Sequence, residues 1–304
     1  MDMAENKDRV DSPAEIRRDG WKAILKRLWS ELQDDRVLLA AAGVTYYAIL
    51  ALVPSLSALV SVYGLFFDTA AAASHLRHLD YVVPGGAIEV VRDQVSRLAG
   101  ERSGKLGFAF VISLVVALWS SNRGMKAVFE AMNIAYDTSE QRGFFKLTAI
   151  TLAFTAAGIL ILLVLIAAIV AVPVIIGDLG FGGPLVWLLA APVYALALLL
   201  IAAAVTALYR WGPSRPDAEW RWVAPGTAVT VLLISALSVG FSWYTANFGS
   251  FDRTYGSLGA LIGFMTWMWM SIAVLIAGGE LNSEIENQAG VSGGADDADA
   301  GDTA

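Results

Sequence analysis

Six long stretches without a charged side chain constrain this sequence more than any other feature. Each one approaches or exceeds the roughly 20 residues that a helix needs to cross the ~30 Å hydrocarbon core of a bilayer. Their apolar residues are continuous and do not alternate with polar ones, which is typical of membrane helices. The sequence therefore predicts an all-α polytopic membrane protein, a bundle of six transmembrane helices plus amphipathic interfacial helices. The predicted spans are 37–67, 106–122, 147–177, 179–209, 222–251 and 254–279.

The charge balance argues against a nucleic-acid partner. Charged residues make up 16% of the chain, whereas a soluble domain carries about 25%. The net charge of −7 comes from the acids at and beyond Glu280, where no Lys or Arg occurs, so the remaining chain has as many acids as bases. A neutral body offers no basic face of the kind that binds phosphates, and no nucleic-acid partner is expected.

Residues suited to metal or redox chemistry are scarce. The chain has no cysteine, which excludes disulfides and thiolate metal sites. The two histidines, His75 and His78, lie three residues apart in the loop 68–105, and no third anchoring ligand accompanies them. We therefore predict no metal site, no cofactor and no catalytic residue.

Lysine and arginine counts predict the orientation. Outside the six spans, the segments on the same side of the membrane as the N-terminus contain fifteen of these residues. The segments on the opposite side contain six. Because positive residues favour the cytoplasmic face, both termini are predicted in the cytoplasm. The chain then divides into a cytoplasmic N-terminal segment, 1–36, a transmembrane domain, 37–287, and a disordered acidic tail, 288–304.

The N-terminal segment contains an amphipathic stretch, residues 21–32. Its apolar side chains recur at helical spacing, and its basic ones lie largely off that face, which predicts an interfacial helix on the anionic inner leaflet. The simpler alternative is that it only anchors the first span. The apolar face consists of Trp21, Ile24, Leu25, Leu28 and Trp29.

A polar stretch from Trp119 to Arg142 follows the shortest span and contains the main candidate site. At 3.6 residues per turn, Lys126, Glu130, Asn133 and Asp137 fall on one side of a helix that continues the span. Ionisable groups at a membrane edge are candidates for function because burying them is costly. The alternative is an ordinary solvated face on which Lys126 and Glu130 form an i,i+4 pair. The predicted substrate-binding residues are Asn122, Arg123, Lys126, Glu130, Asn133 and Asp137, with Tyr47, Glu280 and Asn282 from other helices.

Proline and glycine positions suggest where the helices bend and pack. Pro54, Pro173 and Pro192 lie inside predicted spans and should kink them, either as hinges or as packing notches. Small residues three or four apart give the last span a flat face that allows close helix packing. That face consists of Gly256, Gly259, Ala260 and Gly263.

Five motifs in register resemble the YihY/virulence factor BrkB family of bacterial inner-membrane proteins, which carries the old label ribonuclease BN. The resemblance covers residues 20 to 287 and implies six transmembrane helices with cytoplasmic termini in a bacterial or archaeal cytoplasmic membrane. It also implies export of lipids or other envelope components, and that the nuclease label is a misassignment. The motifs are AAGVTYYAILALVPSL, WSSNRGMKAVFEAMNIAYDTSEQRGFFK, WRWVAPGTAV, YGSLGALIGFMTWMWM and GGELNSEIE.

Three classes of function remain open from the sequence. The first is transport of a lipid or other envelope-related small molecule across or within the membrane. The second is a structural or regulatory membrane subunit, and the third is a membrane-embedded lipid-modifying enzyme. Ribonuclease activity is not expected with only two histidines, and no GxxxxGK[ST] loop indicates a nucleotide-driven pump. The predicted partners are membrane lipids and either a second copy of the chain or an envelope protein.

Overall fold

The computed structural model of the chain is helical throughout the part it describes. Within that part a short 3-10 helix, Pro13–Glu15, precedes seven α-helices. The helices are α1 (Arg18–Asp34), α2 (Val37–Phe66), α5 (Leu106–Ala135), α6 (Phe144–Asp178), α7 (Pro184–Trp211), α8 (Trp220–Asn247) and α10 (Gly259–Gln288). The described residues are 12–66, 106–178, 184–215, 219–247 and 259–290.

Four described helices are long and apolar enough to cross a membrane, which confirms the all-helical membrane class. The segments that meet this standard lie in α6, α7, α8 and α10. In α2, the described apolar segment is the shorter Val37–Ala51. The helices α2 and α5 occupy the first two predicted spans, but the count of six spans stays a prediction. The crossing segments are Phe144–Ile161, Ala191–Trp211, Trp220–Thr245 and Leu261–Gln288.

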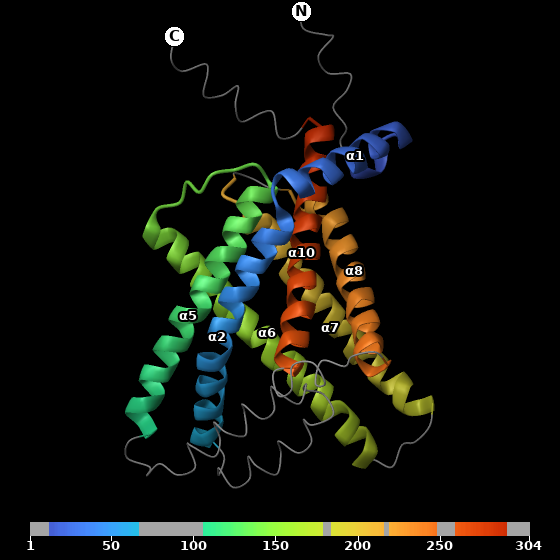
Figure 1. Cartoon of the computed structure of the whole chain (residues 1–304). Helices are drawn as coiled ribbons and strands as arrows, with labels where there is room; N and C mark the ends of the chain where they lie inside the picture. Colours follow the sequence, from blue (N-terminus) through green and yellow to red (C-terminus); the bar gives the residue numbers. More distant parts are fainter. Residues whose placement is uncertain (1–11, 67–105, 179–183, 216–218, 248–258, 291–304) are drawn as a thin grey trace, which may run out of the picture.

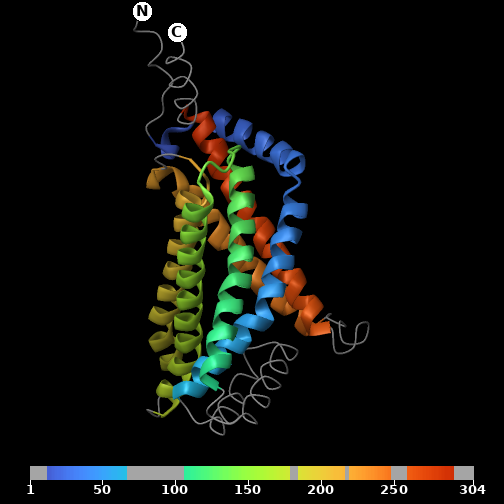
Figure 2. The same cartoon turned by 90° about the vertical axis from the view of Figure 1, so that its left-hand side faces the viewer.

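The helix α10 forms the centre of the bundle. It packs against α1, α2, α5 and α8, while α6 and α7 complete the bundle beside α5 and α8 (Figure 1, Figure 2). Aromatic side chains tie it to its neighbours: Trp269 donates from Nε1 to the Leu38 carbonyl of α2 at 2.9 Å. On another side, the Tyr209 hydroxyl of α7 donates to the Leu275 carbonyl of α10 at 2.7 Å. A shift of α10 would therefore disturb its contacts with most of the other helices.

Two glycines bring α8 and α10 into backbone contact. A Cβ atom on Gly226 would lie 2.2 Å from the Gly278 carbonyl oxygen, and one on Gly278 would lie 1.9 Å from Thr230 Oγ1. The sequence predicted close packing at the other end of the last span. The predicted flat face includes Gly256 and Ala260. Gly256 and the side chain of Ala260 lie outside the described residues, so this face stays a prediction.

The helix α1 crosses one end of the bundle and is divided between two environments (Figure 2). Its Ile24 is completely buried in a cluster with Leu281 and Ile285 of α10. By contrast, Leu25 is 58% exposed and Trp29 is 71% exposed. The predicted single apolar face is therefore wrong in one respect: half of it packs on protein, and only the half around Leu25 and Trp29 is available to a membrane surface.

Candidate functional site at the polar end of the bundle

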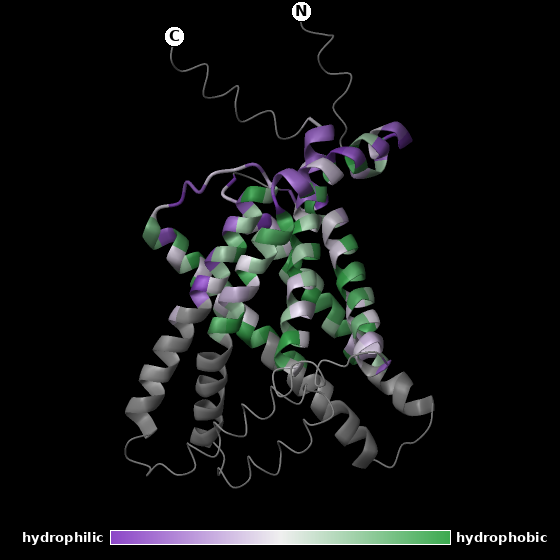
Figure 3. Ribbon diagram, in the orientation of Figure 1, coloured by the Kyte–Doolittle hydropathy of each residue, from purple (hydrophilic) through white to green (hydrophobic). Residues whose placement is uncertain are grey.

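Hydrophilic residues gather at the end of the bundle where α1 crosses it, which we call the polar end (Figure 3). Here α5 continues beyond the predicted span as far as Ala135, and α10 continues nine residues beyond 279 to Gln288. The segment that links α7 to α8 and the one that links α5 to α6 lie at the same end (Figure 1). The continuation of α5 as one helix, predicted from the sequence, is confirmed.

Asn133 joins three segments at the polar end. Its side chain is buried, its Oδ1 accepts from the Ser214 backbone N–H at 2.7 Å, and its Nδ2 donates to Glu140 Oε2 at 3.1 Å. Arg142 completes the connection by donating to Glu140 and to the carbonyls of Trp211 and Gly212, at 3.0 and 2.7 Å. These carbonyls lie at the C-terminal end of α7, where a cation also favours the helix dipole. The geometry gives Asn133 a structural role in fixing the loops.

The Glu140–Arg142 contact predicts a loss of stability in acid. Hydrogen bonds from Arg142 lower the pKa of Glu140 to about 2 from its ordinary value of 4.5. A carboxylate with a lower pKa in the folded state stabilises that state above the unfolded pKa. The contribution is therefore present at neutral pH and is lost as the pH falls from about 4.5 towards 2. We expect Glu140→Gln to lower the melting temperature in detergent at neutral pH by about 2 °C or more and to remove this part of the acid dependence.

Glu219→Gln is the matched control for this prediction. Glu219 pairs with Arg221 at the surface, and both side chains are about half exposed. Such an exposed pair contributes little, so this variant should keep the wild-type acid dependence. Equal acid profiles for Glu140→Gln and the wild type would contradict the prediction.

Asp137 does not lie on the predicted helical stripe. The helix α5 ends at Ala135, and Asp137 has a φ of 48°, in the left-handed region that often terminates a helix. Its N–H donates to the Ile134 carbonyl at 2.9 Å. Desolvation, together with the charges of Asp35 and Glu284, raises the pKa of Asp137. The prediction of one continuous stripe through Asp137 is therefore wrong, because the chain turns before that residue.

The other members of the predicted stripe separate. Lys126 donates to Thr148 Oγ1 of α6 at 2.9 Å and lies over the Phe144 ring, so it is held against the start of α6. Arg123 and Glu130 are exposed. Asn122 is buried, and its Oδ1 has no hydrogen-bond partner among the described residues.

The C-terminal turns of α10 bury three carboxyl groups in different surroundings. Glu284 pairs with Arg27 of α1, and Glu286 pairs with Arg215 of the α7–α8 link. Glu280 is only 3% exposed and pairs with no arginine or lysine of the described segments; its carboxyl is in hydrogen-bond contact with that of Asp35. These contacts explain why α10 remains helical and buried past the predicted end of its span.

Asn282 joins α10 to the first turns of α8, on both sides of Pro225. Pro225 interrupts the hydrogen bonding of the first turns of that helix. The completely buried Asn282 accepts from the Gly226 N–H at 2.7 Å and donates to the Val223 carbonyl at 3.2 Å. This predicted site residue therefore joins α10 to α8 and is not open to a solute.

The remaining predicted residues lie away from the polar end. Tyr47 is 39% exposed on α2 and packs edge-on against Tyr46. Pro192 lies inside α7, as predicted. Pro54 and Pro173 fall within α2 and α6, but their side chains lie outside the described residues, and their role as kinks stays a prediction. His75 and His78 also lie outside the described residues.

Sequence reasoning missed the partners that organise the polar end, namely Arg27, Asp35, Arg142 and Arg215. Arg142 lies within the longest family motif, which was the one available signal. The other three lie in charged segments flanking the apolar runs, where nothing in the sequence identifies a partner on a distant helix.

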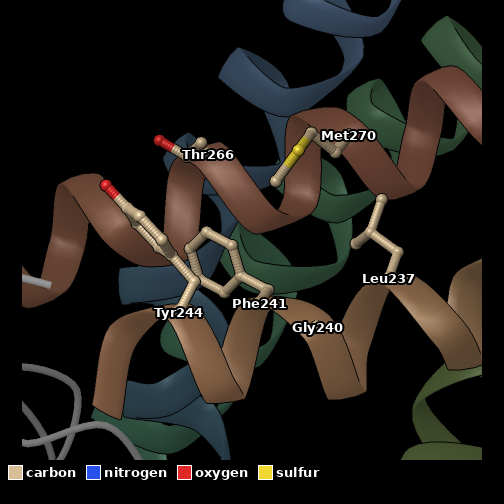
Figure 4. Close-up of a pocket in the computed structure, with 6 residues that line it drawn as sticks. All are labelled: Leu237, Gly240, Phe241, Tyr244, Thr266 and Met270. Carbon is tan, nitrogen blue, oxygen red and sulfur yellow. The ribbon is translucent and has the colours of Figure 1, made fainter. Parts of the chain in front are cut away.

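Two apolar grooves flank α10 in the membrane part of the bundle. One, of about 480 Å³, lies between α8 and α10, and Figure 4 shows the side chains that line it. The other, of about 350 Å³, lies between α2 and α10. Thr266 lines both grooves, and the other lining residues are largely apolar or aromatic. The first is lined by Leu237, Gly240, Phe241, Tyr244, Thr266 and Met270.

Comparison with known proteins gives consistent matches along most of the chain. The family model described as virulence factor BrkB matches residues 28–302. A Bacillus subtilis protein named as ribonuclease-like, YfkH, is 27% identical over 271 residues, covering 86% of this chain and 94% of that protein. A UPF0761 membrane protein of Kangiella koreensis is 26% identical over 268 residues, or 84% of this chain and 62% of its own length.

A further UPF0761 membrane protein, from Methylibium petroleiphilum, is 22% identical over 262 residues, or 85% of this chain and 61% of its own length. The chain thus spans less than two thirds of these UPF0761 relatives. No solved structure matches the chain. With a family model that covers nearly all of its length and a helical membrane bundle, the chain belongs to the virulence factor BrkB family of membrane proteins.

Proposed function

We propose that this protein moves a lipid, or another amphiphilic envelope molecule, across or within the bacterial cytoplasmic membrane, with both chain termini in the cytoplasm. The observation that carries the proposal is the pair of apolar grooves on either side of α10. Grooves of several hundred cubic ångströms with mainly apolar walls suit an apolar ligand that needs only a few polar contacts. An acyl chain is the ligand of that kind that a bilayer supplies.

The polar contacts of the proposed ligand would come from hydroxyl groups in the grooves and from charged groups on α5, which lines neither groove. Thr266 and Tyr244 line the groove between α8 and α10 and each carries a hydroxyl, and that of Thr266 donates to the Ile262 carbonyl at 2.8 Å. Towards the polar end, Arg123 and Glu130 are exposed on α5 and are not held in the loop contacts that engage Asn133. We assign them to the passage of the head group. Asn133 and Asn282 act as supports.

Filling a groove tests this function directly. Gly240 lines the groove between α8 and α10, and a Cβ atom there meets nothing within 4 Å. Gly240→Leu should therefore fold and occupy the space of the acyl chain. In vesicles of phosphatidylethanolamine and phosphatidylglycerol, we expect this variant to slow translocation of a fluorescent phospholipid roughly tenfold, as for added bulk in an apolar pocket.

Gly158→Leu is the matched control. Gly158 also has nothing within 4 Å of an added Cβ, but it lies on α6, which lines neither groove. This variant should translocate at the wild-type rate. If Gly240→Leu also does so, the groove is not the path. If the wild-type protein gives no translocation above empty vesicles, the transport function is wrong, and a structural or regulatory subunit becomes the better interpretation.

A further inference from the structure

Glu280 occupies an unusual position for an acidic residue. It lies on the central helix α10, is 3% exposed, and its Oε1 is buried without a hydrogen-bond partner among the described residues. Its carboxyl is in hydrogen-bond contact with the carboxyl of Asp35, the residue that ends α1. A buried polar oxygen without a partner in a native structure calls for an explanation, such as a bound proton or other small ligand.

The charges around this pair do not neutralise it. From α1 it is approached by Glu31, and from the end of α5 by Asp137. Two arginines at this end pair with other acids: Arg27 of α1 with Glu284, and Arg215 with Glu286. Two further guanidinium nitrogens of Arg215 are buried without a hydrogen-bond partner among the described residues, and neither is paired with Glu280.

Within the part of the chain that the structure describes, no ion pair joins a lysine or arginine to Asp35 or Glu280. On the α5 side, Tyr136 is a buried phenol that packs against Arg215. The helices α2 and α8 contribute buried apolar side chains, among them Val37 and Trp222. Arg36, beside Asp35 in the chain, is exposed.

Two carboxylates in contact repel each other, and burial penalises the charged form of each further. A single proton between them removes both costs, because a protonated carboxyl donates one hydrogen bond to the ionised one. A metal ion fits less well: among the described residues, no group of three or more acidic or histidine side chains could hold one. The ligand that suits two carboxyls alone is the proton.

We propose that Asp35 and Glu280 together form a proton-binding site that holds one shared proton between α10 and the link from α1 to α2. The site does not depend on the transport function proposed above. Its position gives it a consequence. The link includes Arg36 with a left-handed φ of 50°, and loss of the proton places two adjacent negative charges between it and α10. Deprotonation should therefore loosen the link.

Infrared difference spectra of the detergent-solubilised protein, taken between neutral and strongly alkaline buffer, test for the proton. We expect the carbonyl stretch of a protonated carboxylic acid at neutral pH, lost in alkali. Glu280→Gln should remove this band, and Asp35→Asn should shift its loss to lower pH. Glu284→Gln, one turn further along α10, should retain the band because Glu284 is paired with Arg27 and does not belong to the carboxyl pair. A Glu280→Gln spectrum that superimposes on the wild-type one overturns the proposal.

Hydrogen exchange of the link measures the consequence. In alkaline buffer, exchange of residues 31–37 should be faster in the wild type than in Glu280→Gln at the same pH, because the glutamine resembles the protonated acid. Equal exchange would show that the site does not control the link. Glutamine is isosteric and uncharged, so the variant should fold. If it does not, Asp35→Asn provides the same comparison with the partly buried member of the pair. Neither measurement requires lipid transport, so their failure is distinct from failure of the function proposed above.

Discussion

Gly226→Ala should destabilise the protein by about 3 kcal/mol or more, the upper part of the range for overpacking a well-packed interior. The added Cβ would lie 2.2 Å from the Gly278 carbonyl oxygen and 2.4 Å from Asn282 Oδ1. The first of these atoms is backbone and the second belongs to a completely buried side chain, so neither can move aside cheaply. The helices α8 and α10 would have to separate. A large fall in melting temperature in detergent is the expected measurement.

Gly240→Ala is the control on the same helix. An added Cβ at Gly240 meets nothing within 4 Å, and alanine favours a helix over glycine by about 1 kcal/mol. This variant should melt at or above the wild-type temperature. If Gly226→Ala melts together with Gly240→Ala, the close approach of α8 and α10 described here is wrong.

The second large effect is expected for Asn282→Leu. This substitution leaves the Gly226 N–H and the Val223 carbonyl without the side-chain partner that Asn282 provides on both sides of Pro225. The Val223 carbonyl still accepts from Thr227 Oγ1 at 2.9 Å, so the Gly226 N–H is the group left unsatisfied. One buried polar group without a partner costs about 1–3 kcal/mol, and a loss of about that size is expected. Chemical denaturation in detergent should show a lower midpoint.

Asn247→Ala provides the comparison for Asn282→Leu. Asn247 is exposed at the end of α8, and within the described ranges its amide donates to the Trp243 carbonyl of its own helix. Its removal should change stability by no more than about 0.5 kcal/mol, the usual effect at a surface position. If the two variants unfold at the same midpoint, the hydrogen bonds from Asn282 to α8 do not stabilise the fold.

The sequence alone predicted the helices better than the contacts between them. Continuous apolar runs are a local property, so α6, α7 and α8 begin and end within a few residues of their predicted limits. The sequence did not predict that α10 continues past residue 279, because a charged segment considered alone is typical of a loop. Its acids are buried by partners far away in the chain: Arg27 is 257 residues from Glu284, and Arg215 is 71 residues from Glu286. No pattern within a window of one helix contains that information.

The candidate site was predicted in part for the same reason. Helical spacing placed Lys126, Glu130 and Asn133 on one side of α5, but it could not show that Lys126 contacts α6 or that Asn133 is held by Ser214. The grooves beside α10 depend on how far apart neighbouring helices lie, and for α8 and α10 the closest approach is at Gly226 and Gly278. The carboxyl contact of Asp35 and Glu280 likewise follows from packing, because the two residues lie far apart in the sequence.

The seating of α1 on α10 imposes an order on biosynthesis. Ile24 and Arg27 find their partners, Leu281, Ile285 and Glu284, in the last described helix. While the intervening helices are still being made, that face of α1 has no protein to cover it. The exposed Leu25 and Trp29 can meanwhile keep α1 at the membrane surface. A chain released before α10 is complete therefore leaves this apolar face of α1 uncovered. Such an exposed face distinguishes the incomplete chain from the folded protein and can be recognised by a quality-control protease.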